Sequence, residues 1–233
     1  MGSPPNERYV VAAAHSWNRR VFDDKLSHQP GLWTLVDQRA ALTAERLAVV
    51  DPRYVFFLHW SWNVPREVFD AYECIGFHMT DLPYGRGGSP LQNLILRGHR
   101  TTVLTAFRIG EELDAGPIYL GAPLSLEGRA EEIYERASRL AADLVRQILQ
   151  APPTPVPQEG DVVIFRRRTP SESCLPQDAS PEQLYDFIRM LDADGYPRAF
   201  MECRGMRVEF SRAALEHGFV RAQTRISAAN VSE

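Results

Sequence analysis

The sequence lacks several features that mark particular classes of protein. No apolar run approaches the roughly 18 residues of a membrane span, and the first residues lack the basic-then-apolar order of a signal peptide. The three cysteines are widely spaced, and no Cys/His cluster has the spacing of zinc ligands. We therefore expect a cytoplasmic protein with no membrane contact, no disulfide framework and no bound metal.

The sequence also lacks an excess of positive charge. Its formal net charge is −4 at pH 7, whereas a domain that binds nucleic acid usually carries a broad basic face. It contains neither a GxGxxG nor a GxxxxGK[ST] motif, which argues against a dinucleotide site and a P-loop. We therefore expect a small-molecule substrate and no nucleic-acid partner.

The composition is that of an ordinary globular protein, with 44% hydrophobic and 24% charged residues. A chain of 233 residues is long enough for one sizeable core with a small appendage. The clearest boundary is a proline-rich stretch, APPTPVPQ, at residues 151–158. We predict a first domain over residues 1–150, a linker over 151–160 and a small C-terminal domain over 161–233.

Short apolar runs alternate with amphipathic segments up to residue 150. This alternation predicts an α/β fold with a doubly wound, mostly parallel sheet. Beyond the linker we expect a small α+β appendage, with a tail after Val220 that is mobile because it has little apolar content. The predicted strands are 9–14, 32–36, 54–59, 101–109, 162–165, 199–202 and 206–211, and the predicted helices are 19–27, 44–50, 65–72, 90–97, 125–150 and 180–191.

Two polar residues lie in loops that follow predicted strands. His78 enters a loop rich in glycine and proline, and Asp114 lies in a second turn 36 residues later. This separation is about the length of one strand–helix–strand unit, so neighbouring strands can bring the two side chains together. Polar groups at the carboxyl ends of strands are where open α/β sheets bind ligands.

The stretch from 74 to 120 resembles the family of formyltransferases that use 10-formyltetrahydrofolate. The family pattern is Asn-x-His-Pro-Ser-x-Leu-Pro, then Arg-Gly and a proline, then Leu-Asp-x-Gly. In this sequence Met79-Thr80 replaces Pro-Ser, and Gly76 replaces the asparagine that is catalytic in the family. The residues in register are His78, Leu82, Pro83, Arg86, Gly87, Pro90, Leu113, Asp114 and Gly116.

The resemblance implies an N-formyltransferase that moves a formyl group from 10-formyltetrahydrofolate to a small amine, such as a nucleotide-linked amino sugar or a natural-product amine. It implies that His78 donates to the developing oxyanion, and that Asp114 orients His78 and assists proton removal. Two alternatives stay open. One is a hydrolase that uses water as the acceptor, and the other is a folate-binding protein without turnover, which Gly76 favours.

The resemblance also implies which residues hold the folate. In the family, the loop after the third strand lines the pterin pocket, and the backbone of the later acidic loop holds the pterin. Each tryptophan is equally consistent with packing on the sheet, and the side chains of the two glutamates fit surface positions. The arginine could either stabilise its own loop or contact an anionic acceptor. The candidates are Trp60, Trp62, Val64, Arg86, Glu111, Glu112 and Leu113.

The C-terminal part bears a looser resemblance to the end of amino-sugar formyltransferases. The residues concerned are Arg167-Arg168-Thr169-Pro170 and Tyr196-Pro197-Arg198-Ala199-Phe200. We hypothesise that this part either joins two copies in a homodimer or shapes the acceptor site. If a different side chain replaces the donor missing at Gly76, the candidates are His59, Asn63, Thr80 and Asn93.

Overall fold

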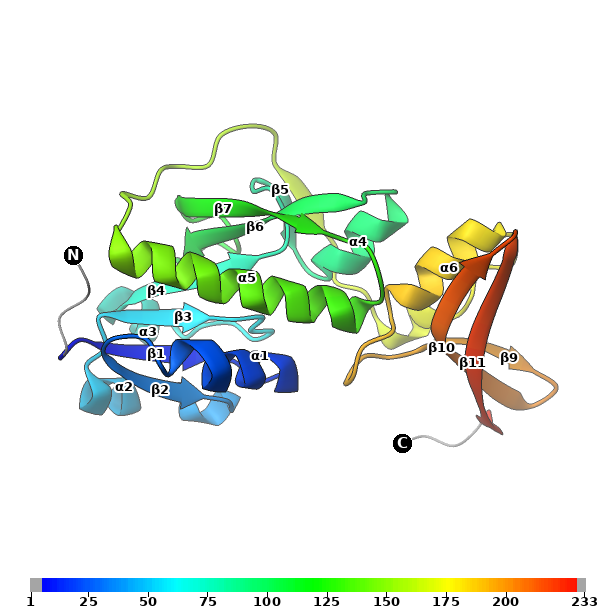
Figure 1. Cartoon of the computed structure of the whole chain (residues 1–233), viewed down its shortest axis with the longest axis horizontal. Helices are drawn as coiled ribbons and strands as arrows, with labels where there is room; N and C mark the ends of the chain where they lie inside the picture. The colour runs from blue at the N-terminus through cyan, green and yellow to red at the C-terminus, as the bar shows by residue number, and fades with distance from the viewer. Residues whose placement is uncertain (1–5, 230–233) are drawn as a thin grey trace. The chain divides into compact units, whose positions relative to one another are not determined.

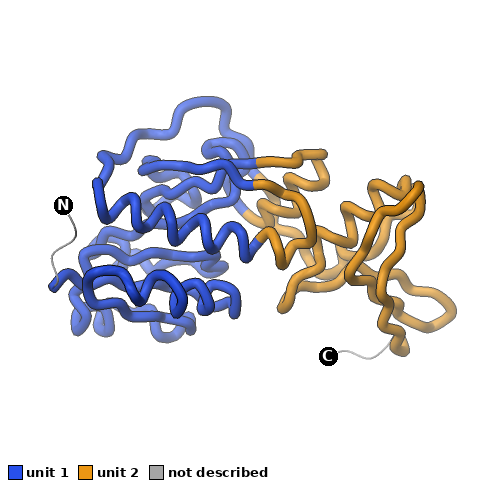
Figure 2. Tube along the Cα trace, viewed as in Figure 1, with its two compact units in different colours: residues 1–87, 102–124, 134–164 blue, residues 88–101, 125–133, 165–233 orange. Residues whose placement is uncertain are grey.

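A computed structural model describes residues 6–229 of the chain. The chain forms two compact units, each built from three segments (Figure 2). Unit 1 consists of residues 1–87, 102–124 and 134–164, and unit 2 consists of residues 88–101, 125–133 and 165–233. The predicted domains are continuous stretches, whereas both units are discontinuous. The boundaries at residues 150 and 160 stay a prediction about which parts fold independently.

Unit 1 is organised around a six-stranded sheet of order β2-β1-β3-β4-β6-β7 (Figure 1). Strand β1 pairs in parallel with β2 and β3, β3 pairs in parallel with β4, and β4 pairs antiparallel with β6. The predicted class, a mostly parallel doubly wound sheet, is confirmed. The strands are β1 (Arg8–Ala12), β2 (Leu32–Val36), β3 (Tyr54–Phe57), β4 (Glu73–His78), β6 (Thr101–Arg108) and β7 (Ile118–Ser125).

Helices cover both faces of this sheet. On one face, α2 (Ala44–Val50) and α3 (Arg66–Ala71) bury Leu47 and Val68 against side chains of β1, β3 and β4. On the other face, α1 (Ser16–Val21) lies beside α5 (Ala130–Gln150), where the Trp17 and Tyr134 rings stack with centroids 5.5 Å apart. Strands β1 and β3 read as continuous apolar runs because both of their faces are covered.

Most predicted elements form with small shifts of their ends. Helix α1 continues into a π-helical turn, η1 (Phe22–Leu26), and a 3₁₀ turn, η2 (Arg39–Ala41), precedes α2. The predicted helix 125–150 begins only at Ala130, because β7 runs to Ser125 and Gly128 has a φ of 89°. None of the helices in residues 6–229 combines the length and the apolar character that crossing a membrane requires.

A short two-stranded sheet joins β5 (Tyr84–Gly87) to β8 (Val163–Phe165). Strand β8 is close to the predicted strand 162–165, whereas β5 and β7 were not predicted. Strand β5 follows β4 through the loop that starts after His78, and β8 follows the proline-rich stretch. This pairing brings the segment after residue 160 back to the loop that contains the candidate residues.

Unit 2 combines short helices with a three-stranded antiparallel sheet of order β11-β10-β9. Ser180 caps its helix α6 as predicted: the Ser180 hydroxyl accepts a hydrogen bond from the Gln183 N–H. The buried Arg189 donates to the Leu126 and Gly128 carbonyls, which attaches residues 125–133 to α6. The elements are α4 (Pro90–Leu96), η3 (Pro170–Ser173), α6 (Pro181–Arg189), β9 (Ala199–Cys203), β10 (Met206–Glu216) and β11 (Phe219–Ala228).

The prediction of a mobile tail after Val220 is wrong for residues 221–229, and residues 230–233 lie outside the described part. Strand β11 pairs with β10 along a ladder that starts where Phe219 lies opposite Glu216 and ends where Ala228 lies opposite Met206. Low apolar content did not prevent strand formation, because pairing along β10 satisfies the backbone groups of β11 and Val220, Thr224 and Ile226 favour strands. The hairpin predicted across Arg204-Gly205 is confirmed as the turn between β9 and β10.

Candidate functional site

The candidate site begins at the carboxyl end of β4. His78 is the last residue of that strand and is 8% exposed. Its Nδ1 lies 3.7 Å from Oδ2 of Asp114, which belongs to the loop between β6 and β7. The structure therefore brings together the two residues predicted to be catalytic, and their roles stay predictions.

The predicted reason for this proximity needs correction. The end of β6 does not lie at the same edge as the end of β4, because the two strands are antiparallel and Arg108 pairs with Ile75. The loop 109–117 instead folds back along the sheet and carries Asp114 towards His78. The Leu-Asp-x-Gly segment thus reaches the site through its loop conformation, not through the direction of its strand.

The hydrogen bonds of His78 determine which ring nitrogen carries its proton. Nε2 lies 2.8 Å from the carbonyl oxygen of Gly85. A carbonyl can only accept, so Nε2 must be protonated and must donate. Nδ1 is then the nitrogen that faces the Asp114 carboxylate. The Gly85 backbone has a φ of 77°, a left-handed conformation that favours glycine.

Asp114 is held in a strained backbone conformation, with a φ of 54°. Its Oδ2 accepts a hydrogen bond of 2.9 Å from the Gly87 N–H. Two residues later, a Cβ atom on Gly116 would lie 1.8 Å from the Arg108 carbonyl oxygen. Only glycine fits there, which gives a physical reason for the glycine of the Leu-Asp-x-Gly pattern.

Arg86 points its guanidinium at Gln158, a residue of the predicted linker. Its Nε and Nη2 donate to Oε1 of Gln158 at 3.0 and 2.7 Å. Gln158 in turn donates from Nε2 to the carbonyls of Asp114 and Gly116 at 2.8 and 2.9 Å. These bonds fit the loop-stabilising interpretation of Arg86. Sequence reasoning missed Gln158, because a single glutamine in a proline-rich stretch has no recognisable pattern.

Gly76 lies under an aromatic ring. It pairs with Phe107 across β4 and β6, and a Cβ atom at Gly76 would meet the Phe107 ring at 2.8 Å and the Ile109 side chain at 3.3 Å. Gly76 and His78 lie on the same face of β4, since side chains alternate along a strand. The space that the family asparagine needs is thus filled here by the side chain of Phe107.

Of the four candidate donors, Thr80 shares a hydrogen-bond partner with His78. Its buried hydroxyl is 3.5 Å from the same Gly85 carbonyl that His78 contacts. The Asn93 side chain, in unit 2, donates to the Gly88, Ser89 and Arg166 carbonyls. His59 packs against the rings of His15 and Tyr134, and Asn63 is exposed.

The candidate folate residues after β3 differ in their exposure. Trp60 and Val64 are partly buried and pack against the apolar cluster under α2 and α3. Trp62 is 37% exposed. Its ring packs edge-on against that of Trp60, with the ring centroids 4.8 Å apart. The Nε1 atom of Trp60 is buried without a hydrogen-bond partner among the described residues.

The second set of folate candidates lies in the loop after β6. Glu111 and Glu112 are exposed, and Leu113 is 66% exposed. An ion pair of 2.9 Å joins Glu111 to Arg66 at the start of α3. Since α3 directly follows the tryptophan-containing segment, this ion pair places the two sets of candidates beside each other.

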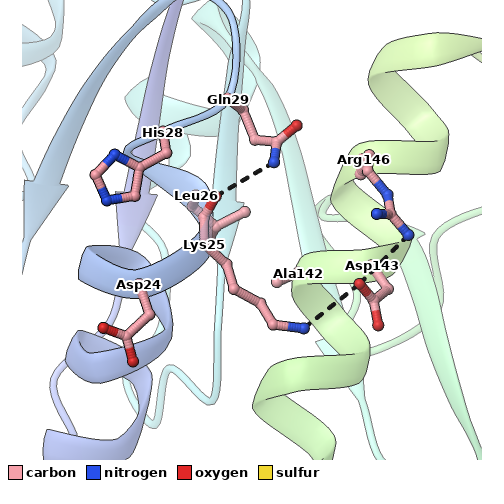
Figure 3. Close-up of a pocket in the computed structure, with 8 residues that line it drawn as sticks. All are labelled: Asp24, Lys25, Leu26, His28, Gln29, Ala142, Asp143 and Arg146. Atoms are coloured by element: carbon pink, nitrogen blue, oxygen red, sulfur yellow. Dashed lines mark hydrogen bonds and ion pairs between the residues drawn. The ribbon is translucent and has the colours of Figure 1, made fainter.

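A polar hollow of about 250 Å³ lies elsewhere in unit 1, between η1 and α5 (Figure 3). Lys25 and Arg146 both approach the Asp143 carboxylate, at 3.6 and 3.5 Å. None of the predicted site residues lines this hollow, and both of its cations are paired with the same carboxylate. Among residues 6–229, no group of three or more His, Cys, Asp or Glu side chains is arranged to hold a metal ion.

Comparisons with known proteins find formyltransferases. Residues 170–227 match the family model described as the C-terminal domain of methionyl-tRNA formyltransferase. The methionyl-tRNA formyltransferase of Halorhodospira halophila is 30% identical over 173 residues, which are 70% of this chain and 54% of that protein. The chain spans about half the length of the curated relatives that it matches.

Solved structures agree with these relatives. A methionyl-tRNA formyltransferase from Clostridium thermocellum is 40% identical, with a TM-score of 0.91 over 96% of this chain and 100% of that chain. HypX from Aquifex aeolicus, solved in complex with tetrahydrofolic acid, is 19% identical, with a TM-score of 0.74 over 91% of this chain and 38% of that chain. At that identity, the likeness to HypX shows the fold alone.

These relatives correct one prediction. A small-molecule acceptor and no nucleic-acid partner were expected, but the relatives are named for methionyl-tRNA, so that expectation is wrong. It relied on the net charge of the whole chain, which averages over different regions. Residues 196–229 hold six arginines and three glutamates. Whole-chain charge is therefore a poor test for a nucleic-acid partner.

Proposed function

Because this chain belongs to the formyltransferase family that uses 10-formyltetrahydrofolate, we propose that it moves a formyl group from this donor to the amino group of an aminoacylated tRNA, with methionyl-tRNA as the first candidate. The observation that supports the proposal is the pairing of the buried His78 with the partly buried Asp114, both in the family register. The name of the 40% identical relative from Clostridium thermocellum supports the choice of acceptor.

The residues present fit a flat, partly apolar donor. Trp62 and Leu113 are exposed apolar side chains on neighbouring segments, and Trp60 has a buried N–H without a partner. Apolar walls with a few polar groups are typical of sites for such molecules. When bound, 10-formyltetrahydrofolate supplies the formyl group. In this proposal the two tryptophans, Val64 and the backbone of residues 111–113 hold it.

His78 and Asp114 handle the proton that the acceptor must lose. An amine attacks only as the neutral base and must release a proton as its new bond to carbon forms. The Gly85 carbonyl accepts from Nε2 of His78, so Nδ1 is the atom that takes this proton. This proposed role differs from the donation to the oxyanion that the resemblance implies, because the neutral ring has no second N–H to donate. Asp114, 3.7 Å away, stabilises the resulting imidazolium. The bond between the formyl carbon and the folate nitrogen must then break, and His78 would return its Nδ1 proton to that departing nitrogen.

The test is to incubate the protein with 10-formyltetrahydrofolate alone, with methionyl-tRNA, and with uncharged tRNA, while following release of tetrahydrofolate. Release that requires methionyl-tRNA supports the proposal. Release without any acceptor indicates a hydrolase. The uncharged tRNA is the matched control, because it offers the same nucleic acid without an amino group to formylate.

A second candidate function is folate binding without turnover. The observation in its favour is Gly76, which lacks the amide donor of the family and whose neighbouring space is filled by Phe107. Removing one oxyanion donor typically costs about 3 kcal/mol of transition-state stabilisation, roughly a hundredfold in rate. Saturable binding of 10-formyltetrahydrofolate with no release in any of the three incubations would favour this function over transfer.

A further inference from the structure

Part of the predicted linker is attached to the site by hydrogen bonds. We call residues 156–163 the strap. At one end, Val156 and Ile118 exchange backbone hydrogen bonds of 2.7 and 2.8 Å. At the other end, the Val163 N–H lies 3.4 Å from the Pro83 carbonyl oxygen. The strap therefore connects the loop that carries Asp114 to the loop that follows His78, and all of these residues belong to unit 1.

Gln158, in the middle of the strap, makes four hydrogen bonds with one amide group. Its oxygen accepts two from Arg86, and its nitrogen donates one each to the Asp114 and Gly116 carbonyls. A primary amide has two donor hydrogens and two acceptor lone pairs, so this side chain is saturated. Glutamate could still accept from Arg86, but it has no hydrogen to donate to the two carbonyls.

These bonds act on a residue with an unusual backbone conformation. Asp114 has a left-handed backbone that costs energy for a residue other than glycine. Gln158 holds the carbonyl of Asp114 itself and the carbonyl two residues further on. The Asp114 side chain then reaches both the Gly87 N–H and the His78 ring. Fixing this backbone therefore fixes the position of the carboxylate beside His78.

We propose that Gln158 is a positioning residue for formyl transfer, which acts by holding Asp114 in register with His78. The expected loss of kcat rests on the proposed function. The expected displacement of Asp114 rests on the hydrogen bonds alone. The strap, most of which was predicted to be only a linker, would then contribute a residue to the candidate site.

The kinetic test compares Gln158→Glu, Gln158→Ala and the control Thr154→Ala, an exposed residue that precedes the strap. We expect kcat to fall about tenfold in the alanine variant and about a hundredfold in the glutamate variant, where an acceptor oxygen faces the two carbonyls. The KM for the folate should change less than about threefold, because no proposed folate-binding side chain is removed. Thr154→Ala should match the wild type.

A second measurement does not require turnover. The Gly87 N–H donates to Asp114, so its hydrogen exchange reports whether that carboxylate stays in place. We expect exchange at Gly87 to become at least about tenfold faster in both Gln158 variants and to be unchanged in Thr154→Ala. A glutamine that only stiffens the linker would leave the exchange at Gly87 unaltered.

The two measurements separate the two ideas. If the wild type transfers no formyl group to any acceptor, the proposed function fails, and the exchange at Gly87 still decides whether Gln158 holds Asp114. Unchanged exchange in Gln158→Glu overturns the positioning role, even if kcat falls. Faster exchange with an unchanged kcat in an active enzyme overturns it as well, because Asp114 would then move without consequence.

Discussion

The two halves of the candidate site are built differently. The half that carries His78 and Asp114 is largely shielded from solvent, and its polar groups are fixed by the Gly85, Gly87 and Gln158 hydrogen bonds. The half that carries Trp62 and Leu113 is exposed and is connected mainly through apolar contacts and one surface ion pair. Groups that handle a proton need a fixed geometry, whereas a surface for a flat ligand mainly needs apolar area.

The largest effect should follow from removing the fixed half. We expect His78→Ala and Asp114→Asn each to lower the rate of formyl transfer by about a thousandfold or more, because each removes a group that handles the proton. Steady-state rates with methionyl-tRNA give the measurement, and circular dichroism checks that both variants are folded.

Asp81→Asn is the matched control for the first prediction, since Asp81 is an exposed carboxylate in the loop between His78 and β5. A normal transfer rate in either site variant would contradict the assignment of proton handling to this half of the site. The residue concerned would then have no part in the mechanism, and its buried hydrogen bonds would serve the fold alone.

The second prediction concerns Gly76, where the fixed half departs from the family. We expect Gly76→Asn to lower the free energy of unfolding by about 1–3 kcal/mol, because the new side chain must displace the Phe107 ring. The transfer rate should not rise. Urea denaturation and the rate assay give the two measurements.

A double variant sharpens this second prediction. Replacing Phe107 by leucine in Gly76→Asn provides space at the ring position and should restore part of the lost stability. A strong rise in rate in Gly76→Asn alone would contradict our interpretation, since it would mean that the asparagine reaches the reacting group without disturbing Phe107.

The third prediction separates the two tryptophans of the exposed half. We expect Trp62→Ala to raise the KM for the folate about tenfold and to leave the melting temperature nearly unchanged, because this side chain is partly exposed. Trp60→Ala should lower the melting temperature, because it removes a ring packed against the apolar cluster. Equal effects on stability would show that both rings only pack on the sheet.

The smallest effect concerns the other end of β4. Burial opposes ionisation of Glu73, but hydrogen bonds from Tyr119 and Arg108 outweigh it and lower the pKa of this carboxyl. A carboxyl group with a lowered pKa stabilises the folded state at pH values above the ordinary pKa of glutamate. This stabilisation is lost as the pH falls through the lowered pKa. Glu73→Gln should therefore be less stable than the wild type at neutral pH and closer to it in acid.

Urea denaturation at neutral pH and at about pH 3 measures this difference. Glu67→Gln, in α3, serves as the control because Glu67 is exposed. The difference in the free energy of unfolding between wild type and Glu73→Gln should be smaller in acid. If it is not, the charge of Glu73 makes no contribution to stability. The transfer rate should be unaffected, since Glu73 lies at the opposite end of β4 from His78.

Local patterns predicted the parts of the molecule that local chemistry determines. The apolar runs of β1 and β3 and the Ser180 cap are readable from a few adjacent residues. The candidate histidine and aspartate were singled out by the family register, and their roles stay predictions. The antiparallel direction of β6, the pairing of β11 and the four hydrogen bonds of Gln158 are not readable from adjacent residues. Each depends on partners that lie far away in the sequence, and no short motif records such a partner.

The discontinuous units have a consequence for the order in which the protein is made. Unit 1 is complete once Ile164 has left the ribosome, whereas residues 88–101 and 125–133 emerge before α6, which they contact in unit 2. Leu91, Leu94 and Ile95 of α4 are buried in the finished protein. During translation α4 is synthesised before α6, with which it packs. Until α6 is made, the apolar surface of these side chains is available to a chaperone.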